Sequence, residues 1–370
     1  MAGSRDERRQ RGDEQERRSS HRHARIAPVA LGPNQPGARP YRGGAGIARF
    51  RRTPSGAASA DEWTPEDFVA STTEVFAGGG VGLTTLPNGV VLRDDLALAP
   101  AAYLGDQHLA AFGADARLLV KLLDTRERLF VHYHPSTAFA RQRLAHASGK
   151  TEAWIIVATD PPAFAYLGFH RDVGEDELLD WFERQDVTAM LAAMNRVELA
   201  PGDTLYVPAG LPHSIGPGVT LVELQQPVDL SIIVEYDGFP GLDAASSLLG
   251  LDARTAFSDL DRSTVTAERL ARLSSSRPVR TESDAAVTPL FPAEADEYFR
   301  ADLIEVDAEV TLDAGFSVLV VLEGEGELGW DGRAVRIVAG QTLLVPHAAG
   351  RIGLRGEVSV LRCRPPAARL

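Results

Sequence analysis

The stretch GDTLYVP at residues 202–208 recurs 138 positions further along the chain as GQTLLVP at residues 340–346. In both copies a glycine turn precedes a short run of strand-forming residues, and a proline closes the run. Small β-barrels use such an element to turn into a strand that ends at the mouth of a pocket. The run VLEGEGEL at 321–328, followed by an alternating strand, gives the second copy the same layout. The repeat therefore predicts two related β units in one chain.

Short runs of strand-forming residues between glycine and proline turns surround both copies and are typical of antiparallel strands. We expect strands within 89–100, 128–135, 152–159, 203–210 and 219–226, and again beyond residue 302. The segments 136–148 and 175–197 have apolar residues at helical spacing, and the second is expected to break near Asp186. The pattern predicts a mainly β protein with a small helical portion, built from two cupin-type jelly-roll barrels in tandem.

The same pattern divides the chain into four parts. Residues 1–26 contain eight arginines and five acidic residues with almost nothing apolar, which predicts a disordered charged tail. Residues 27–240 are expected to form the first barrel with helical insertions, and residues 296–370 the second. The less regular stretch 241–295 is expected to connect them through helices and loops.

Composition excludes several classes of protein. The 370 residues carry a formal net charge of −13 at pH 7, which argues against nucleic acid and anionic membranes as partners. Cys363 is the single cysteine, so no intramolecular disulfide can form, as expected in a reducing cytoplasm. The first residues lack the apolar core of a secretory signal, and no run approaches the roughly 18 apolar residues of a membrane span. We therefore expect a soluble cytoplasmic protein.

The strongest chemical signal is the run His132-Tyr133-His134. Residues i and i+2 of a strand point to the same face, so both imidazoles would lie side by side. On an inward face such a pair can bind a metal such as zinc, whereas on an outward face it is only two solvated side chains. Glu152 at the start of one predicted strand and His213 after the turn near 210 would complete a set of three histidines and one carboxylate. We therefore expect a metal site formed by these four residues.

Three collinear segments, 118–136, 148–159 and 201–231, resemble those of the type I mannose-6-phosphate isomerases, which are zinc enzymes of the cupin superfamily. The likeness continues upstream in 40–50 and 65–71 and only weakly into the second barrel. It implies that 27–240 is the metal-binding catalytic domain. It also implies a zinc-dependent aldose–ketose isomerase that interconverts mannose 6-phosphate and fructose 6-phosphate through a cis-enediol.

The resemblance implies roles for individual residues. The family's zinc ligands, a glutamine, a histidine, a glutamate and a distant histidine, correspond to His132, His134, Glu152 and His213. Histidine thus replaces glutamine at position 132, and three histidines with one glutamate also bind manganese, iron or nickel in other cupins. Two pocket lysines of the family correspond to Lys121 and Lys150. These are the two lysines of a chain with 38 basic residues, and a compact ammonium can do there what guanidinium cannot.

The sequence departs from the family pattern after His213. Where the family has an arginine that faces the substrate, this chain has Ile233, and a hydrophobic side chain cannot bind phosphate or stabilise an enediolate. Either Arg141 or Arg143 from the predicted helix replaces that arginine, or the substrate is not a usual sugar phosphate. The catalytic candidates are Lys150, Glu223 and Asp229. The substrate-binding candidates are Lys121, Ser136, Arg141 and Lys150.

Two other functions stay open at this point. The three-histidine set favours a metal-dependent cupin oxidoreductase, and Ile233 favours a non-catalytic sugar-binding homologue. The expected partner is a small sugar phosphate, with no nucleic acid and no membrane, and the chain is expected to be a monomer or a homodimer. In the second barrel His347 follows Pro346 directly and has no matching His-x-His pair, so we expect that barrel to be free of metal.

Overall fold

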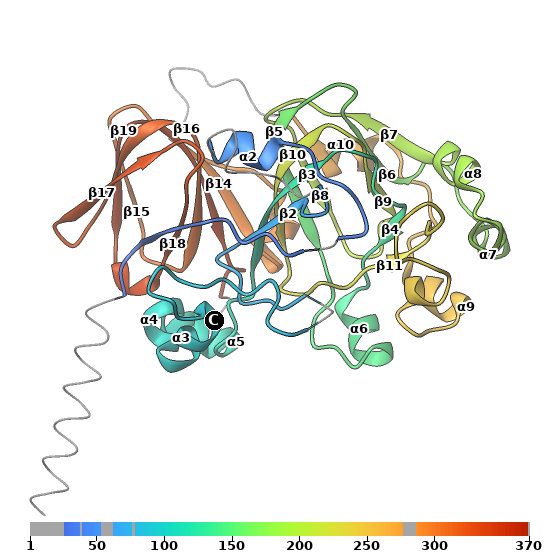
Figure 1. Cartoon of the computed structure of the whole chain (residues 1–370), viewed down its shortest axis with the longest axis horizontal. Coiled ribbons are helices and arrows are strands. Elements are labelled where there is room, and N and C mark those ends of the chain that lie inside the picture. Colours follow the sequence, from blue (N-terminus) through green and yellow to red (C-terminus); the bar gives the residue numbers. More distant parts are fainter. Residues whose placement is uncertain (1–25, 38, 53–61, 76–77, 277–285, 369–370) are drawn as a thin grey trace, which may run out of the picture.

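The computed structural model describes residues 26–37, 39–52, 62–75, 78–276 and 286–368. The predicted charged tail, 1–26, lies almost entirely outside these ranges. Within them the strands form three antiparallel sheets, which confirms the mainly β fold class. Two β units lie side by side, with the C-terminal strands in one half of the molecule and the sheets that carry the candidate site in the other (Figure 1).

Two sheets form the first unit. The six-stranded sheet has the order β12 (Ser274–Ser275), β8 (Thr204–Val207), β5 (Glu152–Thr159), β10 (Val219–Gln225), β3 (Leu119–Thr125) and β2 (Glu66–Val69). The five-stranded sheet has the order β11 (Ile232–Ile233), β4 (His132–Tyr133), β9 (His213–Ile215), β6 (Phe164–Phe169) and β7 (Met194–Glu198). Side chains of the two sheets meet between them, as in the edge contact of Trp154 with the His213 ring at 5.6 Å. The space between these sheets is where the predicted metal ligands lie.

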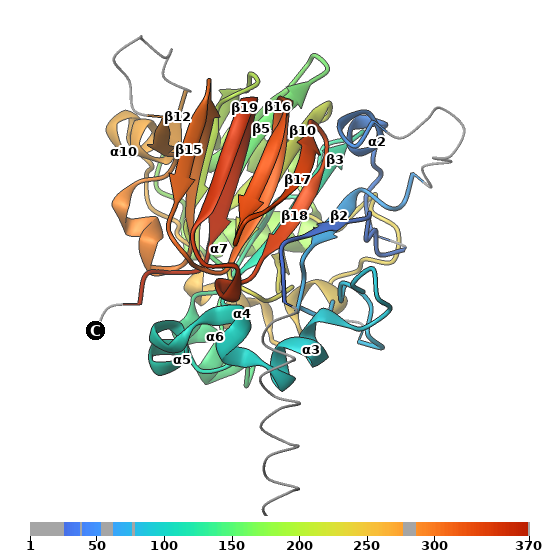
Figure 2. The same ribbon diagram turned by 90° about the vertical axis from the view of Figure 1, so that its left-hand side faces the viewer.

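The second unit is one eight-stranded sheet, seen in front in Figure 2. Its order is β1 (Val29–Leu31), β18 (Thr342–Val345), β16 (Ser317–Trp330), β19 (Ile352–Arg364), β14 (Arg300–Val306) and β13 (Val287–Pro289). Strand β15 (Glu309–Leu312) pairs with β19, and β17 (Arg333–Val338) pairs with β16. Strand β1 thus joins the sheet of the C-terminal unit, although the sequence pattern assigned its residues to the first unit.

The repeated heptapeptide forms the same local structure twice. Strands β8 and β18 both begin at the threonine of the repeat, Thr204 and Thr342, and end just before its proline. The glycines that open the two copies have φ of 94° at Gly202 and 91° at Gly340, a region that favours glycine. The sequence repeat therefore corresponds to a repeated turn and strand, as predicted.

Short helices flank the sheets. They are α2 (Gly46–Phe50), α3 (Leu92–Leu98), α4 (Pro100–Leu104), α5 (Asp106–Phe112), α6 (Thr137–Arg143), α7 (Glu175–Arg184), α8 (Val187–Ala192), α9 (Ala253–Ala256) and α10 (Ala267–Leu273), with 3₁₀ turns η1 (Ser246–Leu248), η2 (Phe257–Asp259), η3 (Ala293–Glu297) and η4 (His347–Ala349). Helices α3 to α5 lie below the sheets and α7 and α8 at the far end of the first unit (Figure 1).

The expected strand at 89–100 was wrong, because this segment contains helix α3 and the start of α4. Leu92 and Leu96, one helical turn apart, are both buried, and two aspartates in the first turn favour a helix N-terminus. In 175–197 the helix does break at Asp186, whose carboxylate caps α8. The end of that segment forms β7 instead of helix, since it pairs along β6.

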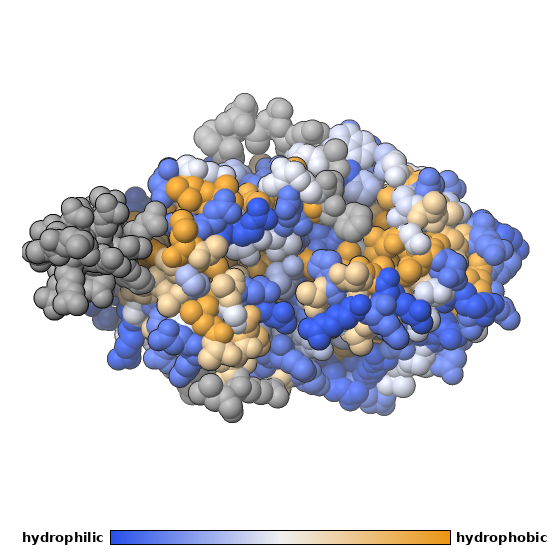
Figure 3. Space-filling model, turned by 90° about the horizontal axis from the view of Figure 1, so that it is seen from below, coloured by the Kyte–Doolittle hydropathy of each residue, from blue (hydrophilic) through white to orange (hydrophobic). Residues whose placement is uncertain are grey.

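The described helices include none long and apolar enough to cross a membrane. The face seen in Figure 3 is largely hydrophilic, and hydrophobic residues gather on it in separate patches. Among the described residues the exposed large hydrophobic side chains are Val81, Val90 and Leu98, which lie within one stretch of the chain, and Val335 on β17.

Candidate metal centre and cavity

A cavity of about 770 Å³ opens between the two sheets of the first unit. Its charged lining residues are Arg39, Glu66, Lys121, Lys150, Glu152, Glu223 and Asp229. The six-stranded sheet supplies several of them from one face, because Lys121 of β3 lies opposite Glu223 of β10, and Glu152 of β5 lies opposite Gln225, two residues along β10. His132 and His213 line the cavity from the other sheet.

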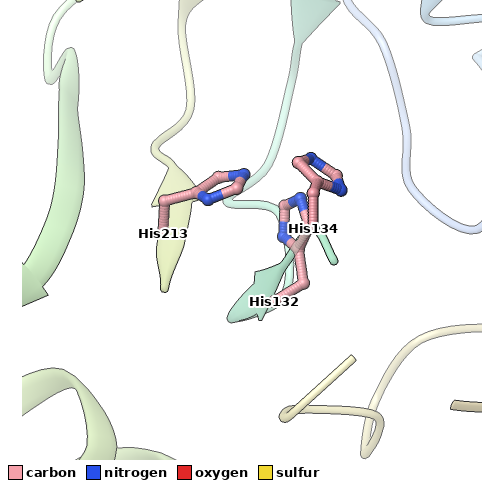
Figure 4. Close-up of side chains that lie close together, drawn as sticks. All are labelled: His132, His134 and His213. Carbon is pink, nitrogen blue, oxygen red and sulfur yellow. The ribbon is translucent and has the colours of Figure 1, made fainter. Parts of the chain in front are cut away.

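The three predicted histidine ligands form one buried cluster, whose ligand atoms all lie within 4.8 Å of one another. His132 on β4 lies opposite His213 on β9, and His134 follows β4 directly. Ring centroids are 4.1 Å apart for His132 and His213, and 4.9 Å for each of the other two pairs. Figure 4 shows the three rings close together, with His213 reaching across from its own strand. The i, i+2 pattern of the sequence thus placed both imidazoles of the pair on the inward face.

Each of these imidazoles is oriented by a backbone carbonyl. Nδ1 of His132 lies 3.0 Å from the carbonyl of Phe130, and Nδ1 of His213 lies 2.9 Å from that of Leu211. Nδ1 of His134 lies 2.8 Å from the Leu230 carbonyl. A carbonyl can only accept, so each Nδ1 must donate its hydrogen. Every neutral ring therefore presents an unprotonated Nε2, as metal-binding histidines do.

Glu152 completes the cluster. Its Oε2 lies 3.0 Å from Nε2 of His134, and its Oε1 lies 3.2 Å from Nε2 of His213. Within the described part of the chain, the buried Nε2 of His213 has no hydrogen-bond partner, and the buried Oε2 of Glu152 makes no hydrogen bond but has the Lys150 ammonium 2.8 Å away. Lone pairs that face each other at this distance repel unless a cation lies between them. Three imidazole nitrogens and one carboxylate therefore fit a divalent metal ion.

The protonation states agree with metal binding. Burial lowers the pKa of His134 to about 4, and burial with the neighbouring rings lowers the pKa of His132 well below its ordinary value. Burial alone would raise the pKa of Glu152, but the charges of His134 and Lys150 hold it well below the usual range. At neutral pH His132 and His134 are therefore neutral and the Glu152 carboxyl is ionised, which is the form that binds a metal.

Lys150 precedes β5 and reaches the cluster. Its Nζ lies 2.8 Å from Oε2 of Glu152, 3.0 Å from Nε2 of His134 and 3.8 Å from Oε1 of Glu223. The side chain is buried, and it lines the cavity. A solvated surface role for Lys150 is therefore wrong, and its ammonium lies between the candidate metal ligands Glu152 and His134 and the carboxylate of Glu223.

Glu223 is the cavity carboxylate whose pKa is raised, whereas those of Glu66, Glu152 and Asp229 are lowered. Burial and the nearby charge of Glu152 raise its pKa to about 7, although Lys150 and Lys121 act in the opposite direction. Its buried Oε1 has no hydrogen-bond partner among the described residues. A carboxyl group that titrates near neutral pH inside a cavity is suited to taking and returning a proton.

Lys121 belongs to a buried ionic network that sequence reasoning found only in part. Its Nζ lies 3.4 Å from Glu66, 3.7 Å from Glu223 and 3.7 Å from Asp229. Arg39 lies 2.6 Å from Glu66 and 3.3 Å from Asp229, and Tyr41 donates a hydrogen bond to Glu66. Arg39, Tyr41 and Glu66 were missed. The signal that could have found Tyr41 and Glu66 is their place in the upstream segments that resemble the isomerases.

Two predicted substrate-binding residues do not join the cavity. Ser136 caps helix α6 and binds Asp259, because it is the residue at which the helix begins. Arg141 is exposed on α6 and donates to the Ala147 carbonyl, and Arg143 is also exposed. Neither arginine lines the cavity, so neither takes the place that Ile233 leaves open. Ile233 itself does line the cavity and lies opposite His132.

Fold and site together define a cupin-type protein of two β units with a buried cluster of three histidines and a glutamate. No protein-family model matches the chain. The curated mannose-6-phosphate isomerase ManA of Bacillus subtilis is 28% identical over 65% of this chain and 72% of its own length. A putative mannose-6-phosphate isomerase of the same organism, YvyI, is 26% identical over 70% of this chain and 79% of its own length.

Solved structures show the same fold. The mannose 6-phosphate isomerase from Bacillus subtilis matches with a TM-score of 0.69 and 24% identity, over 92% of this chain and all (100%) of that one. A putative mannosephosphate isomerase from Archaeoglobus fulgidus matches with a TM-score of 0.67 and 18% identity, over 92% of this chain and 98% of that one. These matches confirm the resemblance to the type I mannose-6-phosphate isomerases that the motifs indicated, and the cupin-type fold.

His347 provides a test of where the metal lies. It sits on η4 and packs so closely on Gly105 that an added Cβ there would be 2.5 Å from the ring. We expect His347→Ala to keep the wild-type metal content, because the ring performs packing in the second unit. Metal analysis of the purified variant, with circular dichroism to confirm folding, checks this. Loss of the metal from a folded His347→Ala protein would show that the ligand set is wrong.

Proposed function

We propose that this chain is a metal-dependent aldose–ketose isomerase. The observation that supports it best is the buried convergence of three unprotonated imidazole nitrogens and one carboxylate beside Lys150 and Glu223, in a cavity large enough for a sugar. The curated relatives are named mannose-6-phosphate isomerases, which supports the same reaction class. The catalytic domain in this proposal is the first unit, which the sequence pattern bounded at 27–240 and which in the structure also includes β12 but not β1.

His132, His134, Glu152 and His213 would hold one divalent ion per chain, and zinc is the ion that the resemblance favours. When bound, such an ion supplies a Lewis acid that orients sugar oxygens and polarises a carbonyl. Imidazole and carboxylate ligands also suit manganese, iron or nickel, so metal analysis is part of every assay below.

The protein's own residues supply the proton transfers. The ionised Glu223 carboxylate removes the proton from C2 of the open-chain aldose, while the Lys150 ammonium donates a hydrogen bond to the carbonyl oxygen at C1. Lys150 passes a proton to that oxygen, and the result is a cis-enediol. Glu223 then returns its proton to C1 while the hydroxyl at C2 gives its proton to the Lys150 amine, so that the C2 carbonyl of the ketose forms and both side chains regain their starting states. Asp229 holds Arg39 and Lys121 in place beside these groups.

The test is ketose formation from two aldoses, D-mannose and mannose 6-phosphate, by metal-analysed protein before and after chelation. We expect the metal-loaded protein to form the ketose from at least one of them, and the chelated protein to lose that activity. Oxygen uptake without ketose would favour a metal-dependent oxidoreductase, which the three-histidine set otherwise allows. Ligand binding without turnover would favour a non-catalytic sugar-binding protein.

Lys150 is expected to be sensitive to even a conservative change. A compact ammonium fits between Glu152 and Glu223, whereas a guanidinium is larger and does not release a proton. We expect Lys150→Arg to keep the fold and metal but to lower kcat at least tenfold, a loss of about 1.4 kcal/mol of transition-state stabilisation. Steady-state kinetics and metal analysis check this. Wild-type turnover in Lys150→Arg would remove Lys150 from the mechanism.

A further inference from the structure

The cations of the cavity are already paired with carboxylates before any substrate enters. Three cationic side chains and four carboxylates line its described part: Arg39, Lys121 and Lys150, with Glu66, Glu152, Glu223 and Asp229. Every one of the three cations lies within 4 Å of at least two of these carboxylates. The seven groups together carry one net negative charge, and a divalent metal would change that to one net positive charge at the ligand cluster.

A phosphate dianion would find no available cation among these residues. Arg39 is held by Glu66 at 2.6 Å, and Lys121 lies 3.4 Å from Glu66 and 3.7 Å from both Glu223 and Asp229. Lys150 lies 3.8 Å from Glu223, which stays beside it when Glu152 binds the metal. To bind phosphate, one of these cations would have to leave a buried carboxylate with one partner fewer, and breaking a buried ion pair is strongly unfavourable. The phosphate would also lie close to the remaining carboxylates, which repel it.

The remaining described residues that line the cavity add no Lys or Arg side chain that could bind an anion. They are mostly apolar and include Trp63, Phe130, Ile215, Ile233, Leu242 and Leu249. Ile233 lies opposite His132 across the β11–β4 pair, so an apolar side chain stands directly beside the metal ligands. An anion placed against these apolar side chains loses its water, and this part of the lining adds uncharged hydroxyls, those of Ser231 and Ser246, where phosphate would need a further cation.

The same lining suits an uncharged sugar. Buried Oε1 of Glu223 and buried Nε of Arg39 have no hydrogen-bond partner in the described part of the chain, and they offer one acceptor and one donor to sugar hydroxyls. Apolar and aromatic walls, such as Phe130, can pack on the C–H faces of a sugar ring. We propose that this isomerase takes an unphosphorylated aldose. The inference rests on the proposed isomerase function and names its substrate class.

The direct test compares kcat/KM for D-mannose and mannose 6-phosphate, measured on the same metal-loaded full-length chain. We expect mannose to be favoured at least tenfold. Equal activity or a preference for the phosphorylated sugar would overturn the inference while leaving the isomerase function intact.

Binding decides the matter if neither sugar is isomerised, an outcome that would contradict the proposed function. In that case thermal unfolding is followed with each sugar in turn. A rise in Tm with mannose and none with mannose 6-phosphate would support the inference. A rise with the phosphorylated sugar, or with neither, would overturn it.

A gain-of-charge variant tests the physical cause. Ile233→Arg places a cation without a carboxylate partner on the cavity wall, and we expect it to shift the kcat/KM ratio at least tenfold towards mannose 6-phosphate. Val335→Arg, at an exposed position of β17 in the second unit, adds the same charge far from the cavity and should keep the wild-type ratio. If Ile233→Arg does not fold, Leu242→Lys, at a partly exposed lining position, takes its place. An unchanged ratio in a folded variant would contradict the inference.

Discussion

Replacing both His132 and His134 by alanine is expected to reduce bound metal from about one ion per chain to less than about a tenth of that. The double variant removes two of three imidazoles that lie within 4.8 Å of one another, and the remaining pair, His213 and Glu152, is too small a set to retain an ion. We expect kcat/KM to fall at least about a thousandfold, since no other group can replace a Lewis acid at that position. Metal analysis and steady-state kinetics on the same preparation measure both effects.

The matched control is the double variant His170→Ala/His347→Ala. His170 is exposed and bonds the Ala192 carbonyl, and His347 lies in the second unit, so removing both rings should leave metal content and turnover unchanged. A bound ion also stabilises the folded state, because it binds the native site alone. Chelation should therefore lower the Tm of the wild-type protein and of the control, but not that of His132→Ala/His134→Ala. Full metal retention in the latter variant would show that the site has been placed wrongly.

Changing Glu223 to glutamine is expected to lower kcat/KM at least about a hundredfold, the size typical of a lost general base. The amide keeps the shape of the side chain but cannot take a proton from C2. Metal content should stay at the wild-type level, because Glu223 approaches Lys121 and Lys150 and is not among the four ligand residues. The matched control is Glu357→Gln, at an exposed position of β19, which should keep wild-type kinetics.

The pH dependence of the wild-type protein tests the same residue. Burial and the Glu152 charge raise the pKa of Glu223 to about 7, so its carboxyl is protonated in the acid range and becomes a base as the pH rises. A metal ion held by Glu152 would offset part of the repulsion between the Glu152 and Glu223 carboxylates, and it would therefore lower the pKa of Glu223 somewhat. We therefore expect kcat/KM to rise with pH between the ordinary carboxyl range and about pH 7 and then to level off. If kcat/KM of Glu223→Gln rises with pH over the same range, Glu223 is not the group whose ionisation causes the rise.

Sequence reasoning predicted the clustering of the three histidines because local rules were sufficient there. The i, i+2 geometry of a strand placed His132 and His134 on one face, and the turn after the repeat led to His213. The fold class followed from the repeated turn and strand, which the structure forms at β8 and β18.

What could not be predicted depends on contacts between distant parts of the chain. Glu66 reaches the cavity because β2 pairs with β3, and Arg39 reaches it because its backbone bonds to that of Trp63 and its side chain to Glu66. Neither contact follows from a local pattern, and only the likeness of the segment 65–71 to the isomerases pointed to Glu66. Strand β1 pairs with β18, more than three hundred residues further along, so a division of the chain by sequence order misplaces it. Arg141 was a reasonable substitute for the missing arginine by residue type, but the helix that carries it directs it to solvent.

The measurement that tests the central claim most directly is isomerisation in deuterium oxide, followed by proton NMR. D-Mannose or mannose 6-phosphate is incubated with the metal-loaded protein, and the ketose is examined for deuterium at C1. In the proposed mechanism Glu223 holds the proton taken from C2 before returning it to C1. While it is on the carboxyl group, we expect this proton to exchange with deuterium from the solvent. The account predicts a ketose that contains deuterium at C1. No ketose from either sugar, or a ketose with no deuterium at C1, would contradict it.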